Sequence, residues 1–392
     1  MTPAPAPLLP LHLDLSGRRV LVVGGGPVAR RRSATLVEAG AAVVVVAPQV
    51  VDGMPGTVLR RPYAPADLDG AWLVVTATGT VDEQVAADCE ARGTWCVRAD
   101  DAFRSAAWVP AAARVDDVVL SVSAGRDPRR AVALRDALAL ALETGELPLR
   151  RSRPGTGSVA LVGGGPGDPG LLTVRGRRLL AGADVVVRDR LAPVVDLPEG
   201  TEVVEVGKSA HGPSWRQADI DALLVEHAQR GRRVVRLKGG DVHVFARGIE
   251  EVAACVEAGL PVEVVPGVSS ALGVPSLAGI PVTARGVNQS VAVVSAHLPP
   301  GDPGSTVDWE ALGRLGGTLV LLMAVERLAA VCAALVAAGR AADTPVAVVQ
   351  DGSLPGQRTV VGTLGDPAAF AGVRAPAVVV VGEVVDLRRV LA

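Results

Sequence analysis

Four short segments place glycine, proline or hydroxyl residues directly after apolar runs of strand length, where they could bind a ligand. They are Gly24 to Ala29, Gly163 to Gly170, Gly239 to Asp241, and Val265 to Ser270. Glycine lets a backbone turn sharply and approach a ligand closely, and a helix that begins there offers N–H donors and the positive end of its dipole. Each segment could also be a tight strand-to-helix connection without a ligand, since such connections use the same residues.

The four segments suit different ligands. Gly24-Gly25-Gly26 follows one predicted strand and opens a helix, which is the geometry that binds a pyrophosphate. The next strand ends at Pro48-Gln49 without an acidic residue for a ribose hydroxyl, so a nucleotide there must be held in another way. The segment from Gly163 lacks the lysine of an ATP-binding loop and suits a large flat ligand. At Gly239-Gly240-Asp241, backbone carbonyls and a carboxylate can face a cationic group such as a sulfonium.

Two carboxylates also follow predicted strands. Asp100 comes directly after Trp95 to Ala99, and Asp189 comes after Val185 to Arg188. Ligands of parallel α/β sheets bind at the carboxyl ends of the strands, where a carboxylate can accept a proton or help to hold a metal ion. A solvated loop residue or a helix cap would explain Asp100 equally well.

The elements that would position these residues alternate between strand and helix. In the first half we expect five strands and two helices, at 18–23, 41–47, 72–77, 95–99 and 118–122, and at 27–39 and 82–92. This βαβ alternation predicts a doubly wound sheet. An amphipathic helix is expected from Asp127 to Glu143, with Leu134, Leu138 and Leu142 on one face. The Arg- and Pro-rich stretch from Pro148 to Ser158 predicts a linker.

A second α/β unit begins at Val159. Its first helix is expected from Leu171 to Leu180, and further strands are expected at 159–162, 183–188, 233–237, 262–265, 291–294, 318–323, 346–349 and 377–381. The fold class is therefore α/β in both halves. Hydrophobic residues make up 49% of the chain, so it has enough apolar material for two buried cores.

Charge and cysteine content exclude several classes of protein. The chain has 39 basic and 41 acidic residues, which gives a net charge of -2 and no pull towards nucleic acid or an anionic membrane. No apolar run approaches the roughly 20 residues that span a bilayer, and the first residues do not form a secretion signal. The four cysteines form no C-x-x-C pair. We expect them to be reduced and buried, in a cytoplasmic protein.

The first half resembles the precorrin-2 dehydrogenase domain of siroheme synthases. The resemblance rests on VVGGGPVARRRSATLVEAGAAVVVVAP (22–48), WLVVTAT (72–78) and CVRADD (96–101). It implies NAD-dependent oxidation of precorrin-2 to sirohydrochlorin, with Asp100 as the catalytic carboxylate. The expected NAD site comprises Gly24 and Gly26 of the turn together with Pro27, Val28, Pro48 and Gln49, and has Thr78 nearby.

The second half resembles the uroporphyrinogen-III C-methyltransferase family across residues 158 to 385. Its blocks occur in the family's order: VGGGPGDPGLLT (162–173), DRL (189–191), VGK (206–208), VVRLKGGD (234–241) and VPGVSSALGVPSLAGIPVT (265–283). The resemblance implies a two-lobed α/β domain that uses S-adenosylmethionine. It assigns Asp189 as proton acceptor and Lys208 as proton donor, although Lys208 could instead bind substrate carboxylates. The expected cofactor contacts are Pro166, Gly239, Gly240, Asp241, Val244, Ser269, Ser270, Met323, Gly352 and Ala377.

These resemblances together predict an enzyme of siroheme biosynthesis. Residues 1–113 would be the NAD domain, 114–157 a short connector and linker, and 158–392 the methyltransferase, acting on a small-molecule tetrapyrrole as a homodimer. Two alternatives stay open: a methyltransferase whose first domain only binds nucleotide or tetrapyrrole, and a precorrin methyltransferase of the cobalamin pathway. We expect iron insertion to be weak or absent, because the connector has only 44 residues and the first domain has one histidine, His12.

Overall fold

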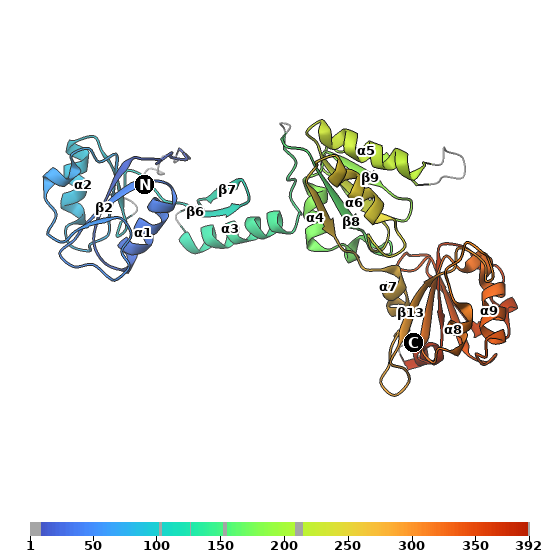
Figure 1. Cartoon of the computed structure of the whole chain (residues 1–392). Helices are drawn as coiled ribbons and strands as arrows, with labels where there is room; N and C mark the ends of the chain where they lie inside the picture. The colour runs from blue at the N-terminus through green and yellow to red at the C-terminus, as the bar shows by residue number, and fades with distance from the viewer. Residues whose placement is uncertain (1–8, 102–103, 126, 152–154, 208–214, 391–392) are drawn as a thin grey trace, which may run out of the picture. The chain divides into compact units, whose positions relative to one another are not determined.

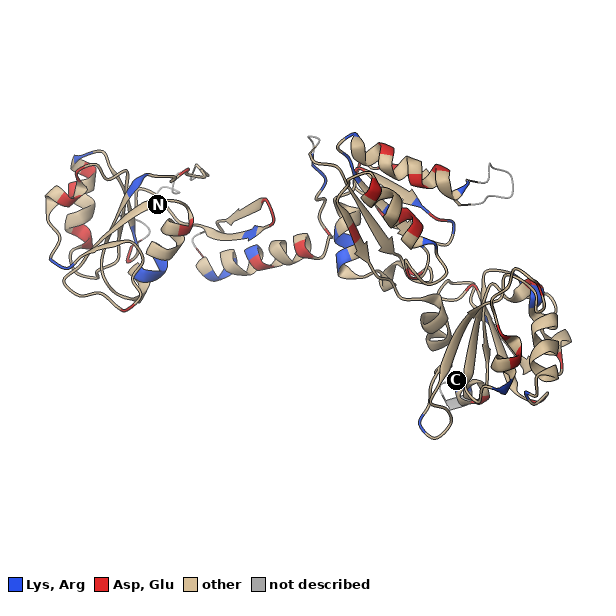
Figure 2. Ribbon diagram, viewed as in Figure 1, with Lys and Arg blue, Asp and Glu red and all other residues tan. Residues whose placement is uncertain are grey.

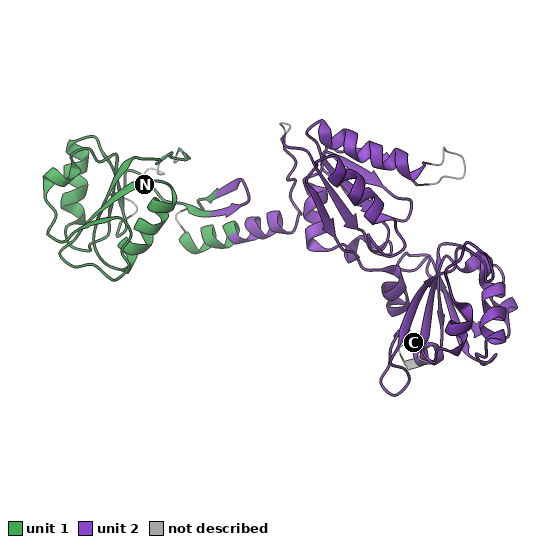
Figure 3. Cartoon of the chain, viewed as in Figure 1, with its two compact units in different colours: residues 1–112, 121–135 green, residues 113–120, 136–392 purple. Residues whose placement is uncertain are grey.

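The computed structural model describes residues 9–101, 104–125, 127–151, 155–207 and 215–390. The chain divides into two compact units, coloured separately in Figure 3: residues 1–112 with 121–135, and residues 113–120 with 136–392. Each unit has its own buried apolar clusters. Each unit is therefore built around its own core, as separately folding domains are.

The first unit contains a parallel sheet of five strands in the order β3-β2-β1-β4-β5. Helix α1 follows β1, and α2 follows β4. Alternate residues of β1 pack on opposite faces, Val22 against Ala29 of α1 and Leu21 against Val85 of α2, so this strand is apolar throughout. The strand order reverses between β1 and β4, which is where such sheets bind ligands. The elements are β1 (Arg19–Val23), α1 (Pro27–Glu38), β2 (Ala42–Val46), β3 (Thr57–Leu59), a 3₁₀ turn (Pro65–Leu68), β4 (Leu73–Thr76), α2 (Asp82–Ala91) and β5 (Trp95–Arg98).

A hairpin and one helix follow this sheet. Strands β6 (Ala111–Val115) and β7 (Val118–Val122) form a two-stranded sheet, and α3 spans Pro128–Glu143. The next residues are attached to the second unit: the Leu149 N–H donates to Ala181 O at 2.9 Å, and Arg150 Nε donates to Asp184 Oδ1 at 3.2 Å. Part of the expected linker from Pro148 to Ser158 is thus bound to the second unit by hydrogen bonds. Because the compact units divide within α3, the domain boundaries at 113 and 157 stay a proposal.

The first sheet of the second unit is parallel, with the order β10-β9-β11-β8-β12. Helices α5 and α6 contribute Leu224 and Cys255 to the cluster on one face, and Leu180 of α4 packs on the other. Both faces of the sheet are thus buried (Figure 1). The elements are β8 (Ser158–Gly163), a 3₁₀ turn (Pro169–Leu171), α4 (Val174–Ala181), β9 (Val185–Arg188), β10 (Glu202–Glu205), α5 (Gln217–Gln229), β11 (Arg233–Lys238), α6 (Gly248–Glu257) and β12 (Val262–Val265).

The second sheet of this unit is mixed. Its order is β13-β14-β17-β15-β16, and only β13 and β14 pair in parallel. Helices α8 and α9 cover one face, and α7 packs on the other. The elements are α7 (Ser270–Leu277), β13 (Val291–Ser295), α8 (Trp309–Arg314), β14 (Thr318–Leu322), a 3₁₀ turn (Val325–Arg327), α9 (Leu328–Ala337), β15 (Pro345–Gln350), β16 (Arg358–Thr363), a 3₁₀ turn (Pro367–Phe370), β17 (Ala377–Val381) and a final 3₁₀ segment (Glu383–Val390).

The predicted α/β class is confirmed, with one helix placed wrongly. The expected helix from Leu171 to Leu180 is a 3₁₀ turn followed by α4, which begins only after Thr173. The Thr173 hydroxyl accepts a hydrogen bond from Gly176 N–H at 3.1 Å and caps the new helix, so the chain breaks there. In the described ranges, no helix is long and apolar enough to cross a membrane. Both units carry acidic and basic residues (Figure 2), although α2 and α6 contain only acidic ones and α4 only basic ones.

Candidate functional site

The glycine turn of the first unit lies between the ends of three neighbouring strands. A Cβ on Gly24 would come within 2.5 Å of Ala77 O, and one on Gly25 within 1.8 Å of Gln49 O, so only glycine fits at either position. Gly26 borders open space and precedes α1, whose first residues are Pro27 and the half-exposed Val28. Residues 48–49 and 78 follow β2 and β4 at this same edge. The structure therefore brings the predicted nucleotide residues together, and the open helix start fits a pyrophosphate.

Asp82 shapes this edge but was not identified from the sequence. Its buried carboxylate accepts hydrogen bonds from the hydroxyls of Thr76 and Thr78 and from the N–H groups of Thr78 and Gly79. Burial raises the pKa of Asp82, but these hydrogen bonds outweigh burial and hold the pKa below its ordinary value. The Thr78 hydroxyl is thus engaged inside the protein, which favours a structural role for it beside the nucleotide.

Asp100 follows β5 as expected and forms part of an ion-pair network. Arg98 binds its carboxylate through two nitrogens, Nε to Oδ1 at 3.1 Å and Nη2 to Oδ2 at 2.8 Å. Arg98 also donates to Glu83 Oε2 at 2.6 Å, as does Arg104 at 2.8 Å. The hydrogen bonds from Arg98 hold the pKa of Asp100 below its ordinary value. The Asp100 side chain is 37% exposed, so an anionic carboxylate faces solvent at the sheet edge.

In the second unit, the three glycine turns interlock at the carboxyl ends of β8, β11 and β12. Gly165 and Gly240 exchange backbone hydrogen bonds of 3.1 and 2.7 Å. A Cβ on Gly163 would lie 2.4 Å from Gly267 N, and one on Gly267 would lie 2.3 Å from Gly240 O. One on Gly239 would lie 2.7 Å from Leu191 O. These close approaches require glycine, so the turns build one continuous backbone surface.

Asp241, the carboxylate of this surface, also has a structural role that was not predicted from the sequence. Asp241 accepts from His243 N–H on Oδ1 at 2.8 Å and from Gly267 N–H on Oδ2 at 3.1 Å, and so ties two turns together. Each oxygen keeps a further lone pair for a ligand. Ser269 caps α7 by accepting from Ala271 N–H at 3.3 Å, and Ser270 lies next to Gly240. The carbonyl of Gly240 accepts from Gly165 N–H and likewise keeps a further lone pair, so its predicted role toward a cationic ligand stays a prediction.

Asp189 directly follows β9, and the buried side chain of Arg236 holds its carboxylate. Arg236 Nη2 donates to Asp189 Oδ1 at 2.6 Å, and the Asp189 side chain is 31% exposed while that of Arg236 is 2% exposed. The carboxylate can therefore reach a ligand on its open side. Lys208, the expected proton donor, lies outside the described residues.

The second lobe contributes residues from the strand ends that face the same way. Met323 follows β14, Gly352 follows β15, and Ala377 begins the antiparallel β17, so all three share one sheet edge. Ser353 Oγ accepts from Asp168 N–H at 3.1 Å, which joins this edge to the first turn of the other lobe. A Cβ on Gly167 would lie 2.9 Å from Leu354. Ser353 and Leu354 of the second lobe thus lie beside Asp168 and Gly167 of the first turn, whereas contact of Val244, Met323 and Ala377 with the cofactor stays a prediction.

Backbone strain gathers around this surface. Among the described residues other than glycine, six have positive φ angles, and five of them follow β11, β14 or β15: Phe245, Arg247, Met323, Asp351 and Ser353. Residues held in this region of φ/ψ space cluster at active sites, because the surrounding structure must stabilise them. This strain was not predicted, since bulky residues such as Phe245, Arg247 and Met323 rarely adopt a positive φ.

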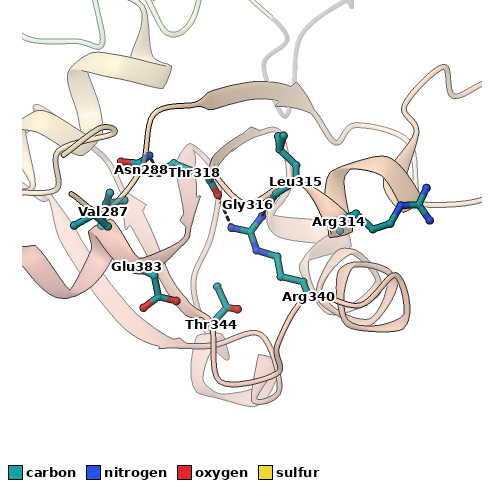
Figure 4. Close-up of a pocket in the computed structure, with 12 residues that line it drawn as sticks. Val287, Asn288, Arg314, Leu315, Gly316, Thr318, Arg340, Thr344 and Glu383 are labelled. Carbon is teal, nitrogen blue, oxygen red and sulfur yellow. Dashed lines mark hydrogen bonds between the residues drawn. The ribbon is translucent and has the colours of Figure 1, made fainter. Parts of the chain in front are cut away.

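A separate pocket of about 210 Å³ lies near the start of β14, at the opposite end of that strand from Met323 (Figure 4). It is lined by Asn288, Arg340 and Glu383, among others, and Arg340 donates to Leu315 O at 3.3 Å and Gly317 O at 2.5 Å. Arg340 therefore stabilises the loop before β14. The pocket is therefore not part of the candidate site.

Comparison with known proteins agrees with this geometry. Residues 158–368 match the family model of tetrapyrrole (corrin/porphyrin) methylases, and residues 11–111 match that of putative NAD(P)-binding proteins. Native uroporphyrin III C-methyl transferase from Thermus thermophilus is 43% identical, with a TM-score of 0.51, and covers 59% of this chain and 100% of its own. The same enzyme complexed with S-adenyl homocysteine is 42% identical, with a TM-score of 0.51, and covers 58% and 93%. A cobalt precorrin-4 methyltransferase is 26% identical, with a TM-score of 0.53, over 58% and 96%.

The fold and the site therefore define a tetrapyrrole methylase joined to an NAD(P)-binding domain. Siroheme synthase of Chromobacterium violaceum is 39% identical over 448 residues, which cover 96% of this chain and 95% of that protein. Siroheme synthase of Pseudomonas putida W619 is 38% identical over 98% and 97%. The chain belongs to the siroheme synthase family. The alignments are longer than the 392 residues of this chain, so these relatives contain residues that it lacks.

Proposed function

We propose that this chain methylates two pyrrole carbons of uroporphyrinogen III to give precorrin-2, and then oxidises precorrin-2 to sirohydrochlorin. The observation that carries the first activity is the continuous backbone surface of Gly163, Gly240 and Gly267, with Asp189 at its edge. Full-length similarity to siroheme synthases, which includes the first unit, favours this function over a precorrin methyltransferase of the cobalamin pathway.

The methyltransferase residues have distinct proposed roles. S-adenosylmethionine supplies an electrophilic methyl group, and the electron-rich pyrrole carbon is the nucleophile. The enzyme positions the two and removes a proton from a ring nitrogen or a bridging carbon of the methylated macrocycle, because the methylated carbon itself carries no hydrogen. Asp189 accepts this proton, and Lys208 is the proposed proton donor. The residues proposed to hold the cofactor are Pro166, Gly239, Gly240, Asp241, Val244, Ser269, Ser270, Met323, Gly352 and Ala377.

The first unit is proposed to bind NAD at the turn from Gly24. NAD accepts hydride when it is bound. Gly26 and the first turn of α1 would hold the pyrophosphate, while Pro48, Gln49 and Thr78 flank it at neighbouring strand ends. Asp100, kept anionic by Arg98, would accept the accompanying proton.

Three further properties complete the proposal. We expect a homodimer, because Leu134, Leu138 and Leu140 of α3 are each at least 40% exposed and form apolar surface. We expect a cytoplasmic location, because all four cysteines are buried and free of disulfides. We expect little iron insertion, because the connector is short.

An omission experiment tests the two activities. Purified enzyme receives uroporphyrinogen III, S-adenosylmethionine and NAD, with one component left out at a time. We expect no methylated product without S-adenosylmethionine, and precorrin-2 to accumulate without NAD. Accumulation of precorrin-2 even with NAD present would instead support a first unit that binds nucleotide without catalysis.

A further inference from the structure

Two cations and one carboxylate are buried together behind the candidate methyl-transfer site. Arg236 and Lys238 lie two residues apart on β11, so their side chains leave the same face of the sheet. Each is 2% exposed. Glu251 of α6 packs on that face and is fully buried. Charged side chains are rarely buried unless they are paired, so the cluster needs an explanation.

Glu251 bridges the two cations with separate oxygens. Arg236 Nε donates to Glu251 Oε1 at 3.0 Å, and Lys238 Nζ donates to Glu251 Oε2 at 2.8 Å. Gln217 Nε2 of α5 adds a hydrogen bond to Oε1 at 3.3 Å and also binds Asp221 Oδ1 at 2.8 Å. The carboxylate is therefore fixed from three directions.

The Arg236 guanidinium is fixed in turn. Its Nε is held by Glu251, its Nη1 donates to Val187 O at 3.3 Å and Leu237 O at 3.4 Å, and its Nη2 donates to Asp189 Oδ1. A planar guanidinium bound at all three nitrogens has one orientation. Asp189 is the partly exposed anion that Arg236 holds directly, so on this side the buried cluster ends at the group that faces the site.

With Arg236 and Lys238 as cations and Glu251 and Asp189 as anions, the four charges sum to zero. Burial lowers the pKa of Lys238, and the nearby Arg236 lowers it further, while Glu251 opposes both effects. Without Glu251, two buried cations would share Asp189 as their nearest anion. Lys238 would then compete with Arg236 for the Asp189 carboxylate, because Lys238 and Asp189 already interact electrostatically.

We propose that Glu251 is a positioning residue for methyl transfer, which neutralises Lys238 and orients Arg236 so that Arg236 presents Asp189 to the substrate. The inference rests on the proposed role of Asp189 as proton acceptor. Replacing a buried ion cluster with apolar residues is often neutral for stability. Positioning of the Asp189 carboxylate therefore explains the burial of these charges better than a gain in folding stability does.

The primary test is Glu251→Gln in the full chain, with uroporphyrinogen III and S-adenosylmethionine as substrates. Glutamine keeps the shape and one acceptor but loses the charge and the second acceptor. We expect kcat for methyl transfer to fall roughly ten- to hundredfold through misplacement of Asp189, while the calorimetric Kd for S-adenosylmethionine stays within about twofold. Glu263→Gln, which removes an exposed partner of Arg175 in the same lobe, is the matched control and should leave kcat unchanged.

A second variant separates positioning from stability. Lys238→Met added to Glu251→Gln restores the charge balance while Gln can still accept from Arg236 Nε. We expect the double variant to recover at least about tenfold of the lost kcat. Failure to recover in folded protein, or an unchanged kcat in Glu251→Gln, would overturn the inference.

Asp189→Asn distinguishes this failure from a failure of the proposed function. Loss of activity in Asp189→Asn with full activity in Glu251→Gln would reject only the role of Glu251. Full activity in Asp189→Asn would reject the proposed role of Asp189 itself, and the inference with it.

Discussion

Gly240→Val should abolish S-adenosylmethionine binding without unfolding the methyltransferase. Gly240 has a φ of +69°, and a Cβ there would meet Ser270 Oγ at 3.4 Å and Ser270 N at 3.6 Å, which are ordinary contacts. The residue is therefore accessible to a side chain, unlike Gly267, where a Cβ would lie 2.3 Å from a backbone oxygen. The γ-methyl groups of valine must extend from this point between the two turns proposed to hold the cofactor.

The magnitude follows from the backbone. A side chain in the left-handed region costs roughly 1–2 kcal/mol, and a β-branched one costs more, so we expect about 2 kcal/mol of destabilisation. For a domain of this size, that loss lowers Tm by roughly 4–8 °C. The cofactor Kd should rise at least about a hundredfold, because a ligand and a side chain cannot share the same space.

The control is Gly259→Val in the same lobe. Gly259 has a φ of +71° and open space around its Cβ position, and it lies between α6 and the start of β12, away from the turns. It carries the same strain, so its Tm should fall equally while cofactor binding is retained. Calorimetry and thermal melts measure both quantities. Undiminished binding in Gly240→Val, or equal loss of binding in Gly259→Val, would refute the placement of the cofactor.

Three further predictions concern the first unit. Asp100→Asn should abolish NAD-dependent oxidation of precorrin-2 but leave methyl transfer intact; a retained oxidation rate would exclude Asp100 as the catalytic carboxylate. Asp82→Asn should cost roughly 2–3 kcal/mol, because an amide replaces a buried acceptor of several hydrogen bonds. Since the pKa of Asp82 is depressed in the folded protein, its stabilising effect is present above the ordinary value of 3.8 and is lost as pH falls from there through the lower folded-state pKa; urea melts of both forms should converge below that folded-state pKa. With sirohydrochlorin and Fe²⁺ under anaerobic conditions, siroheme should form no faster than without enzyme; a faster rate that Asp100→Ala removes would contradict this.

The alternation of strands and helices could be predicted because strands that are buried on both faces leave a strong local signal in the sequence. Val43 to Val46 and Val378 to Val381 are β-branched runs of strand length, and both lie in central strands. Strand direction was harder to predict. The connection from β15 to β16 has seven residues, too few for a crossover, so the pair is antiparallel. We did not predict β16, because Arg358 to Thr363 is half-polar and only partly buried.

The candidate site could be predicted from the sequence only at positions where a single residue type fits the backbone. Glycine at 24, 163 and 239 marks close approaches, and these turns stand out in the sequence. The cluster of Arg236, Lys238 and Glu251 left no such signal. Arg-x-Lys on a strand reads as a solvated face, and only the packing of α6 against β11 shows that both cations are buried around one carboxylate.

The phrase VGGGP, which occurs at 23–27 and again at 162–166, shows why a motif needs its context. In the first copy, Pro27 is the opening residue of α1, so the turn leads to a helix start that can bind a pyrophosphate. In the second copy, Pro166 is followed by Gly167 with a φ of +140°, and no α-helix begins until after Thr173. Without an α-helix dipole at that point, the second turn presents its backbone and the ring of Pro166 to a ligand. Neighbouring segments of the chain pack closely against its glycines. Five identical residues thus support two different binding modes, and the residues that follow them decide which one is built.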